Sequence, residues 1–124
     1  SRQHVCGVIA PALARGDVVV LDRYYTAAPY QAVRPGAPPL AEIIARSEAF
    51  APRPDLVLLL TLPVEVALAR IPRPDAFERV EELRLVAAGY ASLEGPHVVR
   101  VDAARGPEDV AAACWEVVRG LLDA

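Results

Sequence analysis

Two kinds of hydrophobic pattern alternate along this chain of 124 residues. Uninterrupted apolar runs over 18–22, 55–61 and 97–102 are typical of strands buried on both faces of a parallel sheet. Elsewhere, apolar residues recur three and four positions apart, which is the spacing of amphipathic helices. This second pattern predicts helices over 2–15, 39–50, 63–70, from a turn at 71–75 to about Leu93, and over 107–122.

Strands that alternate with helices need crossover connections, and crossovers produce parallel strands with right-handed connections. We therefore expect the α/β fold class, with a parallel sheet and helices on both faces. Three strands make a thin sheet for such a fold. We expect residues 1–124 to form a single, partial domain that is the latter part of a larger α/β domain.

Proline, glycine and alanine dominate residues 23–39, a segment too long to be a simple connector. We expect it to be a loop that contacts substrate. Gly16 follows the first predicted helix, where a terminating glycine is favoured. Trp115 falls at a predicted inward position of the last helix, so we expect it in a core or an interface.

The composition narrows the possible functions. Hydrophobic residues make up 54% of the chain and charged residues 23%, as in a soluble globular protein. The net charge of −3 provides no general attraction for nucleic acid. No apolar run reaches the length of a membrane span, and the chain opens directly into an amphipathic helix instead of a signal peptide. We therefore expect no nucleic-acid or membrane partner and a cytoplasmic location.

An acid and a guanidinium, Asp22 and Arg23, follow the predicted strand 18–22. Ligands of open α/β sheets bind beyond the carboxyl ends of the strands. At that edge a carboxylate can hold a hydrated metal ion, and an arginine can bind a phosphate with two hydrogen bonds. The pair suggests a phosphoryl-transfer site, although a simple strand-end salt bridge is the alternative. The 124 residues contain no GxxxxGK[ST] loop, which such a site would use for the phosphates.

Several segments resemble, in the right order, those of the thymidylate kinase family, which are P-loop nucleoside monophosphate kinases. The resemblance implies a P-loop NTPase-like fold, of which this chain is the C-terminal two-thirds after the P-loop, with a lid-like turn at about 70–78. The matching segments are 4–16 leading into Val18–Tyr24, Pro29-Tyr30-Gln31, Pro54–Arg70, Arg73–Glu78, Gly89-Tyr90 and Val101-Asp102-Ala103.

The family's reaction moves the γ-phosphoryl group of ATP to dTMP and produces dTDP, with Mg²⁺ as the metal. The resemblance therefore implies ATP and dTMP as the substrates. It also implies a homodimer, because helices like the first one pair two subunits in the family.

The resemblance assigns residues to the acceptor dTMP. Arg23 would bind the acceptor phosphate, and Asp22 would act in catalysis and hold Mg²⁺ through water. Tyr30 and Gln31 would line the thymidine pocket. Arg2 is the arginine nearest to the position, occupied here by Ser1, at which the family contacts thymine.

The resemblance also assigns residues to the donor ATP. Arg70 and Arg73 would act in catalysis by closing on the ATP phosphates as lid cations. Ala103 and Arg105 would lie near the adenine. One lid arginine of the family is replaced by Ala76.

Two alternatives remain open. The first is a deoxynucleoside kinase relative, against which an arginine for the acceptor phosphate argues. The second is a degenerate, non-catalytic module that binds a nucleotide or only forms dimers, which the lost lid arginine and the absent P-loop motivate. Without a P-loop, these 124 residues alone should not bind ATP productively.

Overall fold

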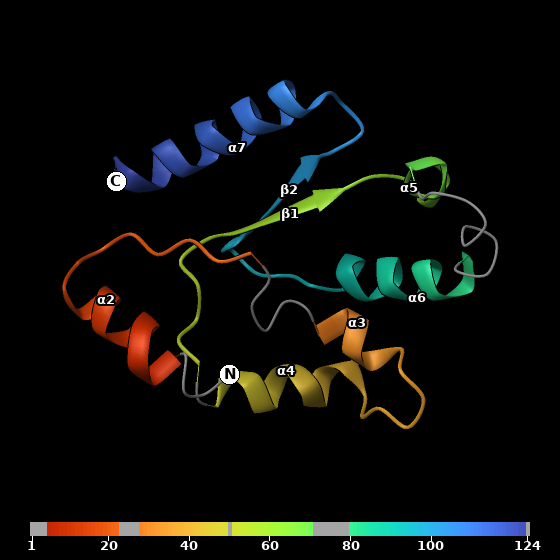
Figure 1. The fold of residues 1–124 in the computed structure, drawn as a ribbon, viewed down its shortest axis with the longest axis horizontal. Helices are drawn as coiled ribbons and strands as arrows, with labels where there is room; N and C mark the ends of the chain where they lie inside the picture. The colour runs from red at the N-terminus through yellow and green to blue at the C-terminus, as the bar shows by residue number, and fades with distance from the viewer. Residues whose placement is uncertain (1–4, 23–27, 50, 71–79, 124) are drawn as a thin grey trace. The chain divides into compact units, whose positions relative to one another are not determined.

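The structure is a computed structural model that describes residues 5–22, 28–49, 51–70 and 80–123. The chain divides into two compact units, Ser1–Arg53 and Pro54–Ala124. Figure 1 traces both units from the N-terminus in red to the C-terminus in blue. Each unit is described by itself below.

A parallel sheet forms the centre of the second unit. Strands β1 (Val57–Thr61) and β2 (Val98–Asp102) pair in register from Val57 opposite Val98 to Thr61 opposite Asp102. The predicted strands over 55–61 and 97–102 are thus confirmed, shortened at their first residues. Because the two strands run in the same direction, both carboxyl ends lie at one edge of the sheet.

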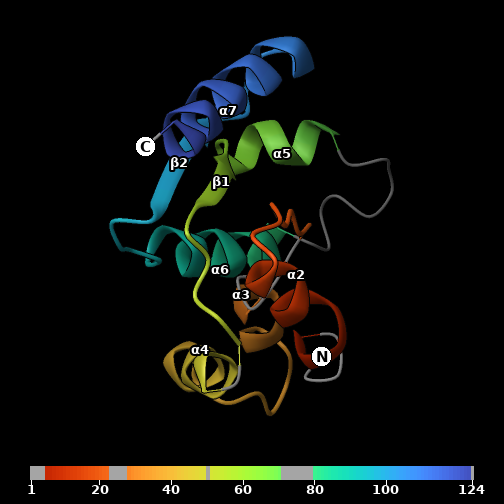
Figure 2. The ribbon, with the colours of Figure 1, turned by 90° about the vertical axis from the view of Figure 1, so that its left-hand side faces the viewer.

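Three helices accompany these strands: α5 (Val64–Arg70), α6 (Val80–Ala91) and α7 (Pro107–Leu122). Two views at right angles place α6 and α7 on opposite sides of the strands (Figures 1 and 2). Pro107 starts α7. The acidic residues Glu108 and Asp109 in its first turn interact favourably with the positive end of the helix dipole. A parallel sheet with helices on both faces confirms the predicted α/β class.

Successive side chains of each strand point in turn toward the α6 side and the α7 side of the sheet. Leu59 and Val101 are buried, whereas their neighbours Leu60 and Arg100 are exposed. Successive residues of a strand point to opposite faces. Arg100 donates to main-chain carbonyls at the end of α6, including that of Leu93 at 2.7 Å, so its face of the sheet is the α6 side. Leu60 therefore lies on the α7 side.

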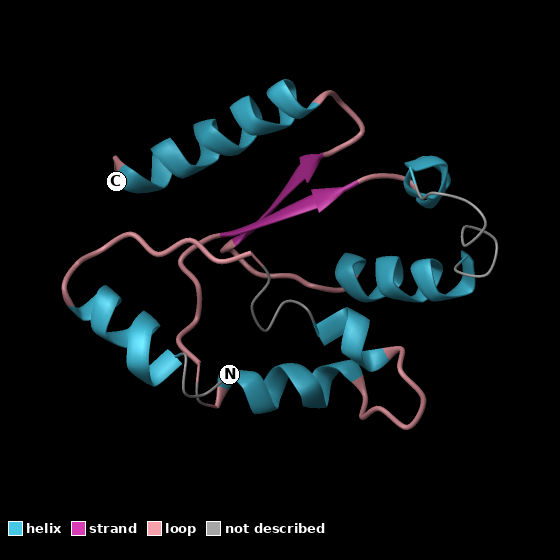
Figure 3. Ribbon diagram, viewed as in Figure 1, coloured by secondary structure: helices cyan, strands magenta, loops and turns pink. Residues whose placement is uncertain are grey.

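The first unit is helical in its described part (Figure 3). Its elements are a π-helix, η1 (Val5–Ile9), and α-helices α2 (Ala10–Ala14), α3 (Ala28–Ala32) and α4 (Leu40–Glu48). The predicted helix over 2–15 is confirmed over η1 and α2, and its first described turn is π-helical. Gly16 follows the helix with φ +83°, as predicted for a terminating glycine.

The segment 23–39 is not a continuous loop, which corrects the prediction. Helix α3 begins at Ala28, and Ala28 and Pro29 are both buried. Proline is tolerated in the first turn of a helix, so its presence did not exclude one here. A turn follows in which the Ala37 N–H donates to the Arg34 carbonyl at 3.0 Å. Gly36 has φ +77°, as the third position of a type II turn requires.

The predicted strand over 18–22 is wrong for the described structure. Residues 17–21 are extended but belong to no sheet, so the sheet of the described residues has two strands and not three. The side chains of Val18 and Val20 are 68% and 87% exposed, and only Val19 packs against buried residues, Ile9 and Ala51. An apolar run becomes a strand only when another strand pairs with its backbone, and the described residues of this unit supply none.

Candidate functional site

The loop after β2 leaves the sheet in a defined shape. The Ala103 N–H donates to the carbonyl of Thr61, the last residue of β1, at 2.8 Å. The next N–H, that of Ala104, donates to Asp102 Oδ1, also at 2.8 Å. Asp102 is the last residue of β2, so its carboxylate closes a tight turn on its own backbone. These bonds tie the loop to the ends of both strands.

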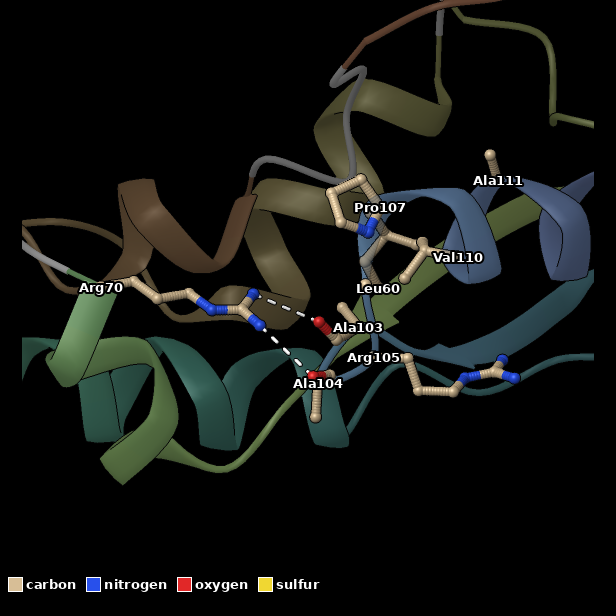
Figure 4. A pocket seen from close by; sticks show the side chains of 9 residues that line it. Leu60, Arg70, Ala103, Ala104, Arg105, Pro107, Val110 and Ala111 are labelled. Carbon is tan, nitrogen blue, oxygen red and sulfur yellow. Dashed lines mark hydrogen bonds between the residues drawn. The ribbon is translucent and has the colours of Figure 1, made fainter.

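Arg70 reaches the same loop from the end of α5. Its Nη1 donates to the Ala103 carbonyl at 3.2 Å, and its Nη2 donates to the Ala104 carbonyl at 3.5 Å (Figure 4). Helix α5 follows β1, and the loop follows β2. The two segments meet because parallel neighbours end at the same edge of the sheet. A contact between residues 33 positions apart in the sequence results.

An open pocket of about 740 Å³ lies beside this loop. Its wall combines apolar side chains of β1 and α7 with two arginines. Arg70 points toward the loop carbonyls, whereas the Arg105 side chain extends away from Arg70 (Figure 4). Such a wall suits an organic ligand that has a flat apolar part and a negative charge. The lining residues are Leu60, Arg70, Ala103, Ala104, Arg105, Gly106, Pro107, Val110 and Ala111.

Three of the residues predicted for the donor side meet at this pocket. Arg70, Ala103 and Arg105 all line it, although they come from a helix and a separate loop. Ala103 is buried, and both arginines are exposed. Their predicted contacts with ATP stay predictions.

The residues predicted for the acceptor side lie in the first unit. Asp22 is exposed in a bend after the extended segment, and Tyr30 and Gln31 lie on α3. Tyr30 is 36% exposed, so the face of α3 that carries it is accessible. Their roles stay predictions. Arg2, Arg23, Arg73 and nearly all of the predicted lid, which spans 70–78, lie outside the described residues.

Sequence reasoning missed residues that line the pocket and one, Asp102, that shapes the loop beside it. Asp102 carried no predicted role, although an acid at a strand end is the same signal that singled out Asp22. Leu60 and Val110 were also given no role, and only the pairing of β1 with β2, which leads into α7, brings them to one pocket. Across the described ranges, histidine, cysteine and acidic side chains nowhere gather in a group of three or more that could hold a metal ion.

The fold and the pocket define an α/β protein that has a parallel sheet and an open pocket at the carboxyl edge of this sheet. The family model for thymidylate kinase matches residues 1–114. The chain is 48% identical over 116 residues to the thymidylate kinase of Akkermansia muciniphila, covering 90% of this chain and 55% of that protein.

Similar identity extends to thymidylate kinases of xanthomonads. The enzyme of Xanthomonas campestris pv. campestris is 42% identical over 127 residues, and that of Xanthomonas euvesicatoria pv. vesicatoria is 44% identical over 126 residues. These alignments cover 98% and 97% of this chain and 54% of each relative. The chain belongs to the thymidylate kinase family, and it spans about half the length of the curated relatives it matches.

Proposed function

We propose that the protein to which this chain belongs transfers the γ-phosphoryl group of ATP to dTMP and forms dTDP. The observation that carries the proposal is the match of residues 1–114 to the thymidylate kinase family. The pocket at the carboxyl edge of the sheet supports it, because it brings Arg70, Ala103 and Arg105 together where α/β folds bind ligands.

The donor ATP is assigned to this pocket. Ala103 and Arg105 would face the adenine, and Arg70 and Arg73 would belong to the donor side of the transfer. In phosphoryl transfer the protein positions the reacting groups and neutralises spread negative charge, so arginines carry the function instead of a nucleophile. The 124 residues hold no GxxxxGK[ST] loop, so the activity is proposed for the product of the complete reading frame.

The acceptor dTMP is assigned to the first unit. Arg23 would bind its phosphate, Tyr30 and Gln31 would line the thymidine pocket, and Arg2 would lie near the base. Asp22 would hold Mg²⁺ through water. Mg²⁺ typically uses one or two carboxylates with substrate phosphates, so a single exposed acid fits it better than a cage would. When bound, the ion would neutralise charge on the phosphates.

The proposal extends to assembly and location. Val8 of η1 and Leu13 of α2 are 56% and 41% exposed, which suits a homodimer formed through this helical segment. A cytoplasmic location is proposed with it. None of the described helices has both the length and the apolarity to cross a bilayer.

A coupled assay on the complete protein tests the proposal. With ATP and Mg²⁺, we expect dTMP to be phosphorylated and thymidine to be left unchanged. Phosphorylation of thymidine but not dTMP would instead identify a deoxynucleoside kinase. Absence of turnover, together with no heat of dTMP binding in calorimetry and a stable dimer, would identify a non-catalytic dimerisation module.

A further inference from the structure

The main-chain N–H and C=O groups of two consecutive residues at the pocket, Ala103 and Ala104, are all hydrogen-bonded. The N–H groups of Ala103 and Ala104 are bonded to Thr61 and Asp102, at the ends of the two strands. Their carbonyls both accept from Arg70. The strand ends therefore fix one side of this loop, and α5 fixes the other through a single guanidinium.

The N–H donors of the Arg70 guanidinium are thus used in hydrogen bonds within the protein. Both Nη atoms face the two carbonyl oxygens, and the planar guanidinium bridges them (Figure 4). Each carbonyl belongs to a residue that lines the pocket. Removing the guanidinium would release the carbonyl side of the loop and leave it held by its N–H bonds alone, so that the loop opens more often.

We propose that Arg70 is a positioning residue that shapes the wall on which the base of the nucleoside triphosphate donor rests, and that it does not bind the phosphates directly. This deepens the proposed function and rests on it. The resemblance assigned Arg70 to the phosphates, whereas the contacts of Arg70 lie with the loop assigned to the adenine. Arg70 acts on the donor through Ala103 and Ala104.

Lysine and glutamine at position 70 separate the two roles. A phosphate-binding arginine would keep part of its effect as lysine, because the charge stays, and would lose it as glutamine. A bridge between two carbonyls needs the planar fork of arginine, which a single ammonium group does not reproduce. A positioning role therefore predicts that Arg70→Lys and Arg70→Gln are impaired to the same degree.

Arg100 provides a matched control. It is also an exposed arginine that donates to main-chain carbonyls, those of Tyr90, Ala91 and Leu93 at 3.4, 3.1 and 2.7 Å. These carbonyls lie at the end of α6 and just after it, and their residues do not line the pocket. Arg100→Gln therefore removes a guanidinium that donates to main-chain carbonyls, but on the α6 side of the sheet, away from the pocket.

The experiment uses the product of the complete reading frame and steady-state kinetics with ATP and dTMP. We expect both Arg70 variants to raise the KM for ATP about tenfold, the effect of losing roughly one hydrogen bond to a charged group, with kcat within about twofold. The KM for dTMP should not change, and Arg100→Gln should match the wild type. A KM for ATP clearly lower in Arg70→Lys than in Arg70→Gln would overturn the proposal, as would a loss confined to kcat.

Hydrogen exchange provides a readout that does not depend on activity. The amides of Ala103 and Ala104 should exchange faster in both Arg70 variants and at the wild-type rate in Arg100→Gln, because only the former release the loop. Unchanged exchange in the Arg70 variants would contradict the inference. A wild-type protein that fails to phosphorylate dTMP would contradict the proposed function, and the exchange rates would still test the loop.

Discussion

At the scale of single residues, Gly95 has a backbone conformation that other residues rarely adopt. Its φ is +151°, and a Cβ built there would lie 2.8 Å from His97 Cε1 and 2.9 Å from His97 Nδ1. The Gly95 carbonyl also accepts from the Val98 N–H, at the start of β2. The absence of a side chain at 95 therefore allows the turn that leads into β2.

Gly95→Ala should lower the free energy of unfolding by roughly 1–2 kcal/mol, since it adds backbone strain and displaces the imidazole of His97. Urea unfolding of the purified protein measures this change. Gly106→Ala is the control, because its φ is −65° and a Cβ there meets nothing within 4 Å. Equal losses in the two variants would show that the contact with His97 does not matter.

Arg23 is the residue on which recognition of the acceptor depends in the proposed function. Arg23→Ala should weaken the dTMP complex by on the order of 2–3 kcal/mol, because a charged hydrogen-bonded contact to phosphate is lost. Arg23→Lys should restore only part of this, since the fork geometry is missing. Initial rates at varied dTMP measure the effect, and an unchanged KM and kcat in Arg23→Ala would refute the role.

At the scale of elements, the amphipathic pattern of α6 separates two adjacent apolar residues. Val86 is 4% exposed, whereas Leu85 is 58% exposed. Val86→Ala should cost roughly 1–2 kcal/mol of unfolding free energy through lost burial and a cavity. Leu85→Ala should cost less than about 0.5 kcal/mol although it removes more atoms, because they already contact solvent. Thermal unfolding of both variants tests this, and a larger loss in Leu85→Ala would contradict the burial of α6.

Apart from α3, helices were predicted from the sequence more accurately than strands. Helix α7 has the predicted bounds, because its apolar period and its opening proline are local signals. The apolar run over 18–22 is as strong as the one that forms β1, but it has no strand partner among the described residues. Trp115 of α7 is 55% exposed, so it does not lie in a core of the described structure, and the other predicted place, an interface, stays a prediction.

At the scale of the whole molecule, many large apolar side chains of the described residues contact solvent, while few of them are buried. Apolar burial supplies most of the stabilisation of a folded domain. The most exposed include Val18, Val20, Leu60, Leu85 and Trp115.

The chain of 124 residues, expressed by itself, should therefore unfold in urea over a broad range and bind an apolar dye such as ANS under native conditions. Fluorescence titration and far-ultraviolet circular dichroism measure both properties. A single steep transition without dye binding would show that the exposed side chains are covered, for example by self-association.

Three members of the candidate site were predictable, but their contacts were not. Resemblance assigned Arg70, Ala103 and Arg105 to one donor side, and the structure places all three around one pocket. The two bonds from Arg70 to main-chain carbonyls could not be predicted, since every residue has a carbonyl and sequence pattern does not distinguish one from another. The same holds for Asp102, whose bond is to the N–H of Ala104.

The sequence by itself determined the α/β class, the family and the helices other than α3, because apolar periodicity, prolines at helix starts and ordered motifs are properties of short segments. Only the tertiary structure decided which apolar runs pair as strands and which side chains meet at the pocket. The physical reason is that strand pairing and main-chain recognition join residues tens of positions apart, as β1 joins β2 and as Arg70 joins Ala103.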